Sequence, residues 1–200
     1  PDVSRLKVLK CDGSGTTYIY KEKEYSLSLC GEYQIENSLT AIEAVSASGF
    51  NIPYETVKKA LGATFFPARA EIISRNPLTV LDGAHNPDGA EALAEIMKKY
   101  GGRITAIIGV MRDKDYETVL KKTLPYCRAA VAVTVENMPR SLACEKLAAA
   151  ASKYCPCITA ENYGAAIEKS RSSAGVNPVF VFGSLYLASG IREKLKNFYN

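Results

Sequence analysis

From residue 69 to its end, the chain alternates short apolar runs with amphipathic segments. The apolar, β-prone runs occupy residues 78–81, 104–110, 129–135 and 178–182, with a weaker run near Ile158. The clearest amphipathic segment carries Ala90, Leu93, Ala94 and Met97, at the i, i+3, i+4, i+7 spacing of a helix with one apolar face. Alternating strands and helices predict an α/β fold with a mostly parallel sheet covered on both faces. Ligands of such sheets bind at the carboxyl ends of the strands.

The first third of the chain lacks this alternation. Two β-prone runs, at residues 6–9 and 17–20, flank Asp12-Gly13-Ser14-Gly15, a composition typical of a hairpin turn. A phosphate-binding loop is the alternative for this turn, but no Gly-Lys-Ser/Thr follows it and no helix opens there.

Two helices are predicted after this hairpin. One covers residues 37–47, with Leu39, Ile42 and Val45 roughly on one face, and a second covers residues 53–61, with Pro53 in its first turn. Residues 62–67 have the composition of a linker. We therefore expect two parts: residues 1–66, the tail of a domain rather than a complete one, and residues 67–200, a complete α/β domain.

The composition is that of an ordinary soluble globular protein, with 47% hydrophobic and 23% charged residues among 200. The net charge of +4, without a basic stripe interleaved with aromatics, gives no reason to expect nucleic-acid binding. We see neither a signal peptide nor an apolar run long enough to span a bilayer, so we expect a cytoplasmic protein without membrane contact. Because the chain opens with Pro1 rather than Met, we expect it to be a piece of a longer protein.

The cysteines and the single histidine of the chain do not have the spacing of a metal site. The cysteines are Cys11, Cys30, Cys127, Cys144, Cys155 and Cys157, and His85 is the only histidine. A structural zinc site usually takes four Cys or His ligands, and no C-x-x-C pair is present. We therefore predict no metal ligands in this chain, and buried, reduced thiols.

Segment 78–90, Leu-Thr-Val-Leu-Asp-Gly-Ala-His-Asn-Pro-Asp-Gly-Ala, combines a strand end, a polar loop and a helix start. Asn86 suits a helix N-cap and Pro87 suits the first helical position. Asp82 and His85 should therefore lie at a strand's carboxyl end, beside a helix N-terminus that favours anions. A well-capped turn with a solvated Asp and His explains these local features equally well.

Asp82-Gly83-Ala84-His85-Asn86-Pro87 resembles the signature of the C-terminal domain of folylpolyglutamate and dihydrofolate synthases, which belong to the Mur ligase superfamily. Five further elements resemble the same family in the same order along the chain. They are Gly31-Glu-Tyr-Gln-Ile-Glu-Asn37, Phe66-Pro67-Ala68-Arg69-Ala70-Glu71, Gly109-Val110-Met111-Arg112-Asp113-Lys114-Asp115, Pro139-Arg140-Ser141 and Phe182-Gly183-Ser184-Leu185-Tyr186-Leu187.

This resemblance extends from about Gly31 to the end of the chain. It implies a Rossmann-like C-terminal ligase domain over residues 67–200, preceded by the tail of a central ATPase domain over residues 1–66. Two positions depart from the family pattern. Tyr33 replaces the usual His, which could alter packing near Asn37, and Ala68 replaces the usual Gly, which could stiffen the linker beside Arg69.

The resemblance also implies three nucleotide contacts. Asn37 would meet the adenine end of ATP, Arg69 would reach the phosphates from the hinge between domains, and Asp82 would accept hydrogen bonds from the ribose hydroxyls. Each residue has a plainer alternative. Asn37 would only cap its helix, Arg69 would form a hinge salt bridge, and Asp82 would be the acceptor of an ordinary Asx turn.

His85 and Ser184 are the candidate catalytic residues, since the resemblance places both at the incoming glutamate or at the reacting centre. A buried, hydrogen-bonded histidine and a helix N-cap are the respective alternatives. For Lys114, between Asp113 and Asp115, a solvated loop is an alternative to any role in the site.

The implied reaction is the ATP-driven joining of L-glutamate to folate or dihydropteroate through an acyl phosphate. We expect ATP and Mg²⁺ to be required, with the Walker-type loop and the Mg²⁺ ligands outside these 200 residues, so that this chain alone is an inactive monomer. Whether the acceptor is dihydropteroate, folate or both stays open.

Two alternatives stay open. One is a Mur-type peptidoglycan amino-acid ligase, although Gly83-Ala84 and Asp113-Lys114-Asp115 favour the folate branch. The other is a stand-alone, non-catalytic α/β binding module, against which Pro1 and the incomplete first part argue.

Overall fold

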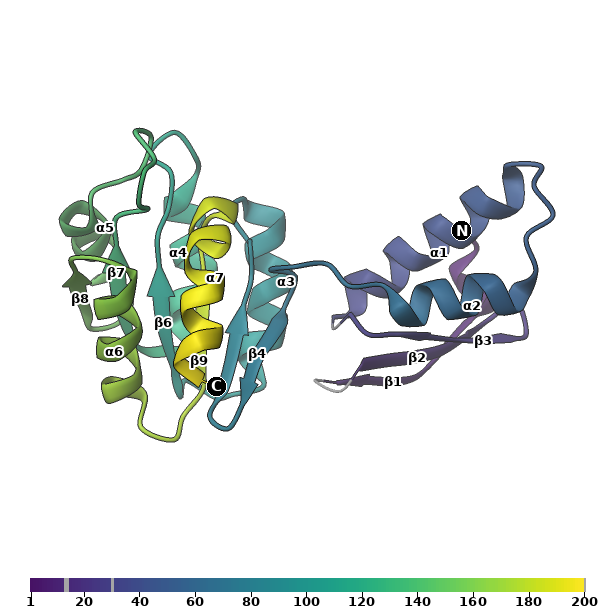
Figure 1. Cartoon of the computed structure of the whole chain (residues 1–200), viewed down its shortest axis with the longest axis horizontal. Helices are drawn as coiled ribbons and strands as arrows, with labels where there is room; N and C mark the ends of the chain where they lie inside the picture. Colours follow the sequence, from purple (N-terminus) through teal and green to yellow (C-terminus); the bar gives the residue numbers. More distant parts are fainter. Residues whose placement is uncertain (13–14, 30, 200) are drawn as a thin grey trace. The chain divides into compact units, whose positions relative to one another are not determined.

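A computed structural model describes residues 1–12, 15–29 and 31–199 of the chain. The chain forms two compact units, Pro1–Pro67 and Ala68–Asn200, which are drawn in Figure 1. No helix in the described ranges is both long enough and apolar enough to cross a membrane.

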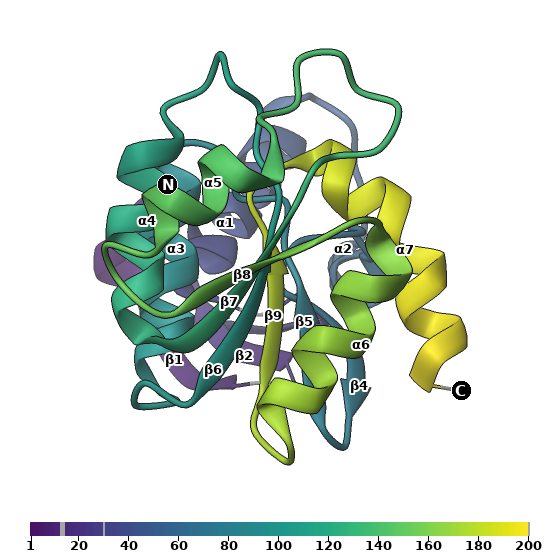
Figure 2. The ribbon, with the colours of Figure 1, turned by 90° about the vertical axis from the view of Figure 1, so that its left-hand side faces the viewer.

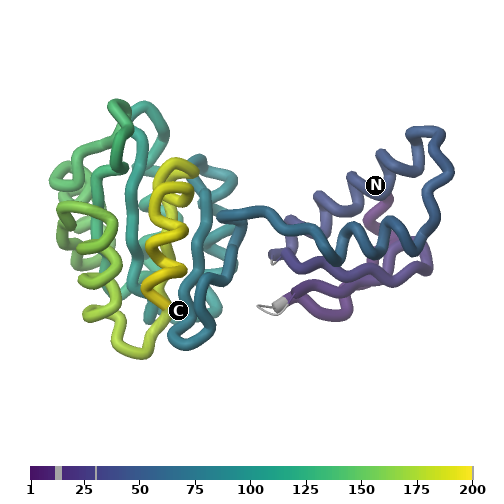
Figure 3. Tube along the Cα trace, in the orientation of Figure 1, coloured from purple at the N-terminus to yellow at the C-terminus, as the bar shows by residue number. Residues whose placement is uncertain are grey.

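The first unit is a small antiparallel sheet followed by two helices, as the trace in Figure 3 shows. Its elements are the 3₁₀ turn η1 (Val3–Arg5), β1 (Leu6–Asp12), β2 (Gly15–Tyr20), β3 (Lys23–Leu27), α1 (Glu32–Ala47) and α2 (Tyr54–Ala63). The strands lie in the order β1-β2-β3. The core packs one sheet face against α1, and it consists of Tyr18, Tyr20, Tyr25, Leu27, Ile35, Leu39 and Ile42.

The hairpin predicted near the N-terminus is present, since β1 pairs with β2 up to Asp12 opposite Gly15. Gly13 and Ser14 of the predicted turn lie outside the described residues. The strand β3 was not predicted. Lys21 and Glu22 connect it to β2 with φ angles of 48° and 66°, a conformation that hairpins usually reach with Asn-Gly or Asp-Gly. Because Lys-Glu carries no turn signature, the second hairpin is invisible in the sequence.

Both predicted helices of this unit exist, with shifted starts. The helix α1 begins at Glu32, so Asn37 lies within it, exposed, and its Nδ2 donates to Gln34 Oε1 at 3.1 Å. The alternative that Asn37 caps its helix is therefore wrong. The helix α2 begins at Tyr54 with Pro53 as its N-cap, and it continues to Ala63. Gly62 is thus helical, and the predicted linker is shorter than expected.

The second unit is a six-stranded sheet in the order β4-β5-β9-β6-β7-β8. Its strands are β4 (Glu71–Arg75), β5 (Leu78–Leu81), β6 (Ile104–Ile108), β7 (Cys127–Val133), β8 (Cys157–Ala160) and β9 (Val179–Phe182). All neighbouring pairs are parallel except β4 with β5. The mostly parallel sheet predicted from the sequence is confirmed.

Helices cover both faces of this sheet, as predicted. They are α3 (Pro87–Lys98), α4 (Tyr116–Thr123), α5 (Cys144–Ala151), α6 (Tyr163–Ala174) and α7 (Leu185–Tyr199), with the 3₁₀ turn η2 (Leu124–Tyr126) after α4. Figure 2 shows α3, α4 and α5 on one face and α6 and α7 on the other. The central strands β6 and β9 are buried throughout, which explains why nearly all of their residues are apolar.

The helix α3 matches its sequence prediction closely. Ala90, Leu93, Ala94 and Met97 are its buried residues. Asn86 is the N-cap, with Oδ1 accepting from Gly89 N at 2.8 Å, and Pro87 occupies the first turn. The loop that precedes α3 is therefore fixed at its helical end.

The antiparallel edge strand β4 was missed. It forms a tight hairpin with β5, in which Arg75 pairs with Leu78. Its residues Glu71 to Ser74 are all half-buried, without the alternation of buried and exposed positions that identifies a one-sided strand. The sequence pattern of residues 71–75 therefore does not predict a strand.

The described cysteines are free thiols. Cys127, Cys144 and Cys155 are buried, whereas Cys11 and Cys157 are half-buried; Cys30 lies outside the described residues. Burial raises the pKa of Cys157 to about 12 and also raises that of Cys155, so these thiols stay protonated at neutral pH. In the part of the chain that the structure describes, no group of three or more His, Cys, Asp or Glu residues could hold a metal ion.

A stability prediction concerns Thr105 in β6, which is 0% exposed and whose Oγ1 has no hydrogen-bond partner among the described residues. Val has the same shape without the buried hydroxyl. Thr105→Val should raise the free energy of unfolding by ~1 kcal/mol, because an unsatisfied buried polar group is removed.

Urea unfolding of the 200-residue chain checks this prediction. Thr123→Val is the matched control, because Thr123 is equally buried but its hydroxyl donates to Val119 O at 2.7 Å. The control should not gain stability. A Thr105→Val protein less stable than the wild type would contradict the expectation.

Candidate functional site

The loops that follow β5 and β9 lie side by side at the carboxyl edge of the sheet. These strands are parallel neighbours, and Asp82 N, directly after the end of β5, donates to Val181 O at 2.9 Å. Beyond that point Gly183 N donates to Ala84 O at 3.0 Å. The prediction that Asp82, His85 and Ser184 share one rim of the sheet is confirmed.

Gly183 allows the loop after β9 to pack closely against the end of β6. Its φ is 115°, and a Cβ at this position would lie 2.9 Å from Gly109 O and 2.9 Å from Val110 Cγ1. Any side chain would therefore be strained in conformation and would push the two loops apart. Glycine at position 183 is what permits Ser184 to approach the end of β6.

Asp82 holds two loops together. The residue is 5% exposed, and its Oδ1 accepts from Ala84 N at 2.7 Å, the short-range bond of an Asx turn. Its Oδ2 accepts from Ala70 N at 2.7 Å, which ties the end of β5 to the segment before β4. The structure thus contains the Asx turn of the plainer alternative and, in addition, a long-range bond. Each oxygen retains a second lone pair for a ligand.

Burial raises the pKa of Asp82 to about 6. The N–H groups of Ala70 and Ala84, and the charges of Arg69 and His85, act in the opposite direction and limit the rise. The carboxyl is therefore mostly ionised at neutral pH. A buried carboxylate held by two N–H groups is a rigid, pre-oriented acceptor.

Arg69 lies in a left-handed loop on the same rim. Ala68 and Ala70, on either side of it, have φ angles of 56° and 47°. Ala68 O accepts from Gly83 N at 2.8 Å, so this loop is tied to the Asp82 loop at a second point. The positive φ of Ala68 explains why the family pattern usually has glycine at this position. A left-handed alanine costs roughly 1 kcal/mol, whereas glycine adopts this conformation without strain.

His85 is half-buried, and its Nδ1 lies 2.9 Å from Gly83 O. A carbonyl oxygen can only accept, so Nδ1 must carry the proton of this bond. In the neutral ring, Nε2 then carries the lone pair and can accept from a ligand. The bond fixes both the tautomer and the ring orientation.

Ser184 is 2% exposed and directly precedes α7. Its Oγ accepts from Tyr186 N at 3.0 Å, and its carbonyl accepts from Ala188 N at 3.0 Å. The N-cap alternative therefore describes a bond that exists. The hydroxyl can still donate its proton, and it lies among the N–H groups of a helix start, where a negatively charged ligand is favoured.

The loops after β6 and β7 complete the edge. Asp113 accepts from Arg140 Nη1 at 2.8 Å, Arg112 N donates to Arg140 O at 2.9 Å, and Ser141 Oγ accepts from Val135 N at 2.7 Å. In the following turn, Asp115 caps α4 by accepting from Thr118 N at 3.1 Å. Lys114 between the two acids is exposed, as a solvated loop requires.

The structure places four of the five predicted site residues on the second unit and Asn37 on the first. Sequence reasoning missed Arg192, whose guanidinium binds Glu71 next to the Arg69 loop. The two partners lie 121 positions apart in the sequence, so their pairing could not be predicted. Only Glu71 is a residue of interest in the sequence, because it belongs to the family-like segment that contains Arg69.

Comparisons with known proteins first define the class. Residues 68–185 match the family described as Mur ligase, glutamate ligase domain, which covers the sheet and the rim loops. The chain thus contains the C-terminal domain of a Mur-type ligase.

Individual relatives identify the family within this class. The folylpolyglutamate synthase of Lacticaseibacillus casei is 31% identical over 199 residues, covering 93% of this chain and 45% of the relative. The dihydrofolate synthase/folylpolyglutamate synthase of Bacillus subtilis is 32% identical over 178 residues, covering 84% and 40%. A solved structure of Mycobacterium tuberculosis folylpolyglutamate synthase complexed with ADP matches with a TM-score of 0.84 at 28% identity, covering 96% of this chain and 48% of that one.

The chain belongs to the folylpolyglutamate synthase/dihydrofolate synthase family and corresponds to the C-terminal part of its members. It spans less than half the length of these relatives.

The raised pKa of Asp82 predicts a pH effect on stability. Its folded value of about 6 lies above the ordinary 3.8, so between these values the folded chain binds more protons than the unfolded chain. The stabilisation is fully present below the unfolded pKa and is lost as the pH rises through the folded one. Unfolding free energy should rise by ~1 kcal/mol when the pH falls from about 7 to about 5.

Urea unfolding at closely spaced pH values in this window measures the slope. Carboxyls with a lowered pKa, such as Glu71, titrate below the window and do not mask the effect. Asp82→Asn is the control, since it cannot titrate, and its slope should be nearly flat. Equal slopes for the two proteins would rule out this assignment.

Proposed function

We propose that the protein to which this chain belongs is an ATP-dependent ligase that joins L-glutamate to the carboxyl group of folate or dihydropteroate. The observation that carries the proposal is the rim itself. A buried carboxylate, an oriented histidine, a capping serine and a loop that carries an arginine meet where three parallel strands end, in a chain of this family.

The nucleotide is assigned to Arg69, Asp82 and Asn37. The guanidinium of Arg69 suits phosphate oxygens because of its planar fork. The free lone pairs of Asp82 can accept from ribose hydroxyls, since its two backbone bonds hold it in place. Asn37 presents an exposed amide to the adenine, a role supported by the family resemblance alone.

The glutamate and the reacting centre are assigned to His85 and Ser184. Nε2 of His85 can accept a proton or a hydrogen bond from the attacking amine, because Nδ1 is occupied by Gly83 O. The Ser184 hydroxyl, at the start of α7, can donate to a carboxylate oxygen of the glutamate.

The proposed reaction has two steps. A carboxylate oxygen of the acceptor attacks the γ-phosphorus of ATP and ADP leaves, giving an acyl phosphate. The glutamate amine attacks the acyl carbon, phosphate leaves, and the amine proton is released, giving an amide. These residues contribute positioning and charge. We assign the Mg²⁺ that accompanies ATP to another part of the parent protein, together with the Walker-type phosphate loop.

The role split between Asp82 and His85 can be tested in the parent enzyme. Asp82→Ala should lower kcat/KM for ATP by about 10- to 100-fold, the effect of losing a charge-assisted hydrogen bond of ~1.5–3 kcal/mol, and should affect glutamate use less. His85→Ala should instead raise the KM for glutamate or lower kcat.

Steady-state kinetics with each substrate varied in turn decides between these outcomes. Asn86→Ala is the matched control, since Asn86 lies in the same loop but only caps α3. It should change thermal stability and leave both substrate profiles intact. Unchanged KM and kcat for ATP in a folded Asp82→Ala enzyme would rule out the ribose role.

The 200-residue chain should fold but form no glutamyl amide alone. Its second unit has a complete core, whereas no phosphate loop of the Gly-x-x-x-x-Gly-Lys-Ser/Thr type occurs in the sequence. Affinity for free ATP should be weak, because little of the triphosphate charge is neutralised. Isothermal titration with Mg·ATP, beside an ADP-release assay with folate and glutamate, measures both. Robust turnover by the purified chain would overturn this expectation.

A further inference from the structure

The loop that presents Arg69 has a conformation that its own residues disfavour. Ala68 and Ala70 both lie in the left-handed region, at φ 56° and 47°. Each such alanine costs roughly 1 kcal/mol relative to a helical or extended backbone. The loop therefore depends on contacts from outside itself to keep this shape.

Two carboxylates supply those contacts, one on each side of Arg69. Asp82 Oδ2 accepts from Ala70 N at 2.7 Å, and Glu71 Oε2 accepts from Ala68 N at 3.0 Å. Both alanines are buried, which limits the access of water to either N–H group. Releasing either carboxylate would free one end of the loop.

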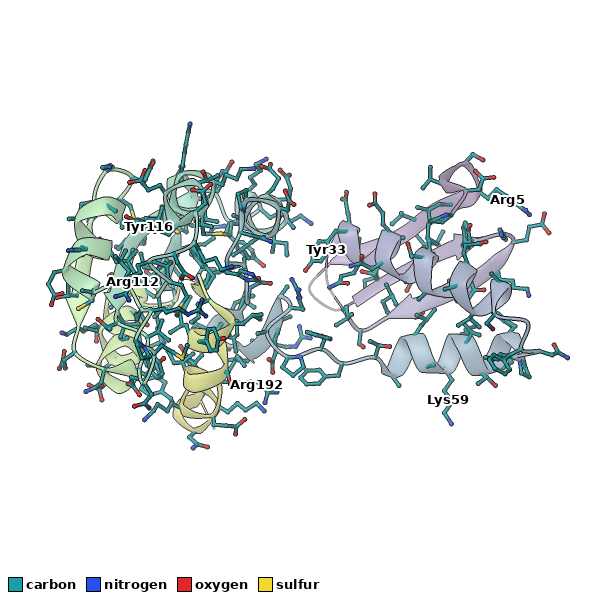
Figure 4. The ribbon with its side chains drawn as sticks, turned by 90° about the horizontal axis from the view of Figure 1, so that it is seen from above. Arg5, Tyr33, Lys59, Arg112, Tyr116 and Arg192 are labelled. Carbon is teal, nitrogen blue, oxygen red and sulfur yellow. The ribbon has the colours of Figure 1, made fainter. Side chains whose placement is uncertain are left out.

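Arg192 of α7 fixes the Glu71 carboxylate. Its Nη2 donates to Oε1 at 2.7 Å, and its Nε donates to Oε2 at 2.9 Å, a two-pronged geometry. Figure 4 labels Arg192 on α7, the yellow helix. The Glu71 side chain is 7% exposed and that of Arg192 20%, whereas the Lys169–Glu161 pair is 41% and 67% exposed. The Arg192–Glu71 pair is thus shielded from water, unlike a solvated surface pair.

We propose that Arg192 is a positioning residue for the ATP-dependent step: through Glu71 and Ala68 it sets the loop that presents Arg69. This inference rests on the proposed function in so far as Arg69 contacts the nucleotide phosphates. The same helix begins at Leu185, directly after Ser184, so one rigid element places both the glutamate-side hydroxyl and, through Glu71, the nucleotide-side guanidinium.

Amide hydrogen exchange of the 200-residue chain tests the mechanical half without any enzyme assay. Arg192→Met should lower the protection of the Ala68 amide by about tenfold or more, because its carboxylate acceptor becomes mobile. The Ala70 amide is the internal reference, since Asp82 holds it independently. Lys169→Met, which breaks an exposed pair, is the matched control and should change neither amide.

Unchanged protection of Ala68 in Arg192→Met would overturn the proposal. An equal loss at Ala68 and Ala70 would also overturn it, because that result indicates general loosening rather than release of one end of the loop.

A double-mutant cycle in the parent enzyme tests the functional half. Arg192→Met should lower kcat/KM for ATP by about tenfold in the wild-type background, as expected for a misplaced contact group. In the Arg69→Ala background the same change should cost less than about twofold, because the group it positions is gone. The loss of thermal stability should be similar in both backgrounds.

Equal kinetic losses in the two backgrounds would show that Arg192 acts only on general stability, and would overturn the proposal. A wild-type parent that makes no glutamyl amide would instead sink the proposed function, and would leave the exchange result standing.

A charge swap separates positioning from simple pairing. Glu71→Arg combined with Arg192→Glu restores an ion pair between β4 and α7, yet the guanidinium introduced at position 71 has no acceptor to offer Ala68 N. The swapped enzyme should regain stability over Arg192→Met without regaining kcat/KM for ATP. Full kinetic rescue by the swap would contradict a role that depends on the carboxylate at position 71.

Discussion

The rim of the second unit depends on one buried carboxyl group, that of Asp82, which joins the segment before β4 to the loop after β5. Desolvating a carboxylate is expensive, and two backbone N–H groups offset that cost only while both loops keep their positions. This carboxyl group holds the left-handed Ala70 beside Arg69, and the His85 ring and the β9 loop contact the same β5 loop at Gly83 O and Ala84 O. The hydrogen bonds that offset the burial of Asp82 therefore also hold the rim loops in one geometry.

Patterns that extend over a whole element could be predicted from the sequence. The strands β5, β6, β7 and β9 are mostly apolar, and α3 has four apolar residues at helical spacing between a clear N-cap and its last turn. The rim position of Asp82, His85 and Ser184 followed from the same reasoning, because residues directly after parallel strands must share an edge.

Features set by tertiary contacts could not be predicted. The β2–β3 hairpin turns on Lys21 and Glu22 at positive φ, which the sheet imposes on residues without that preference. The edge strand β4 is half-buried from Glu71 to Ser74, so its sequence shows no alternation of apolar and polar residues. Arg192 looks like any charged residue on an exposed helix face until its distant partner is known. The start of α1 is hidden for a similar reason, because Gly31, its N-cap, makes no side-chain cap bond.

The position of β9 has a consequence for how the chain is made. This strand is synthesised last, yet it lies between β5 and β6, so it joins a β4–β5 hairpin to a β6–β7–β8 sheet. On the ribosome neither piece can close its central core until the final strand emerges, and the contacts it makes are long in sequence. Loss of the last strand and helix would therefore leave two separate half-sheets with exposed apolar edges, rather than a shortened domain.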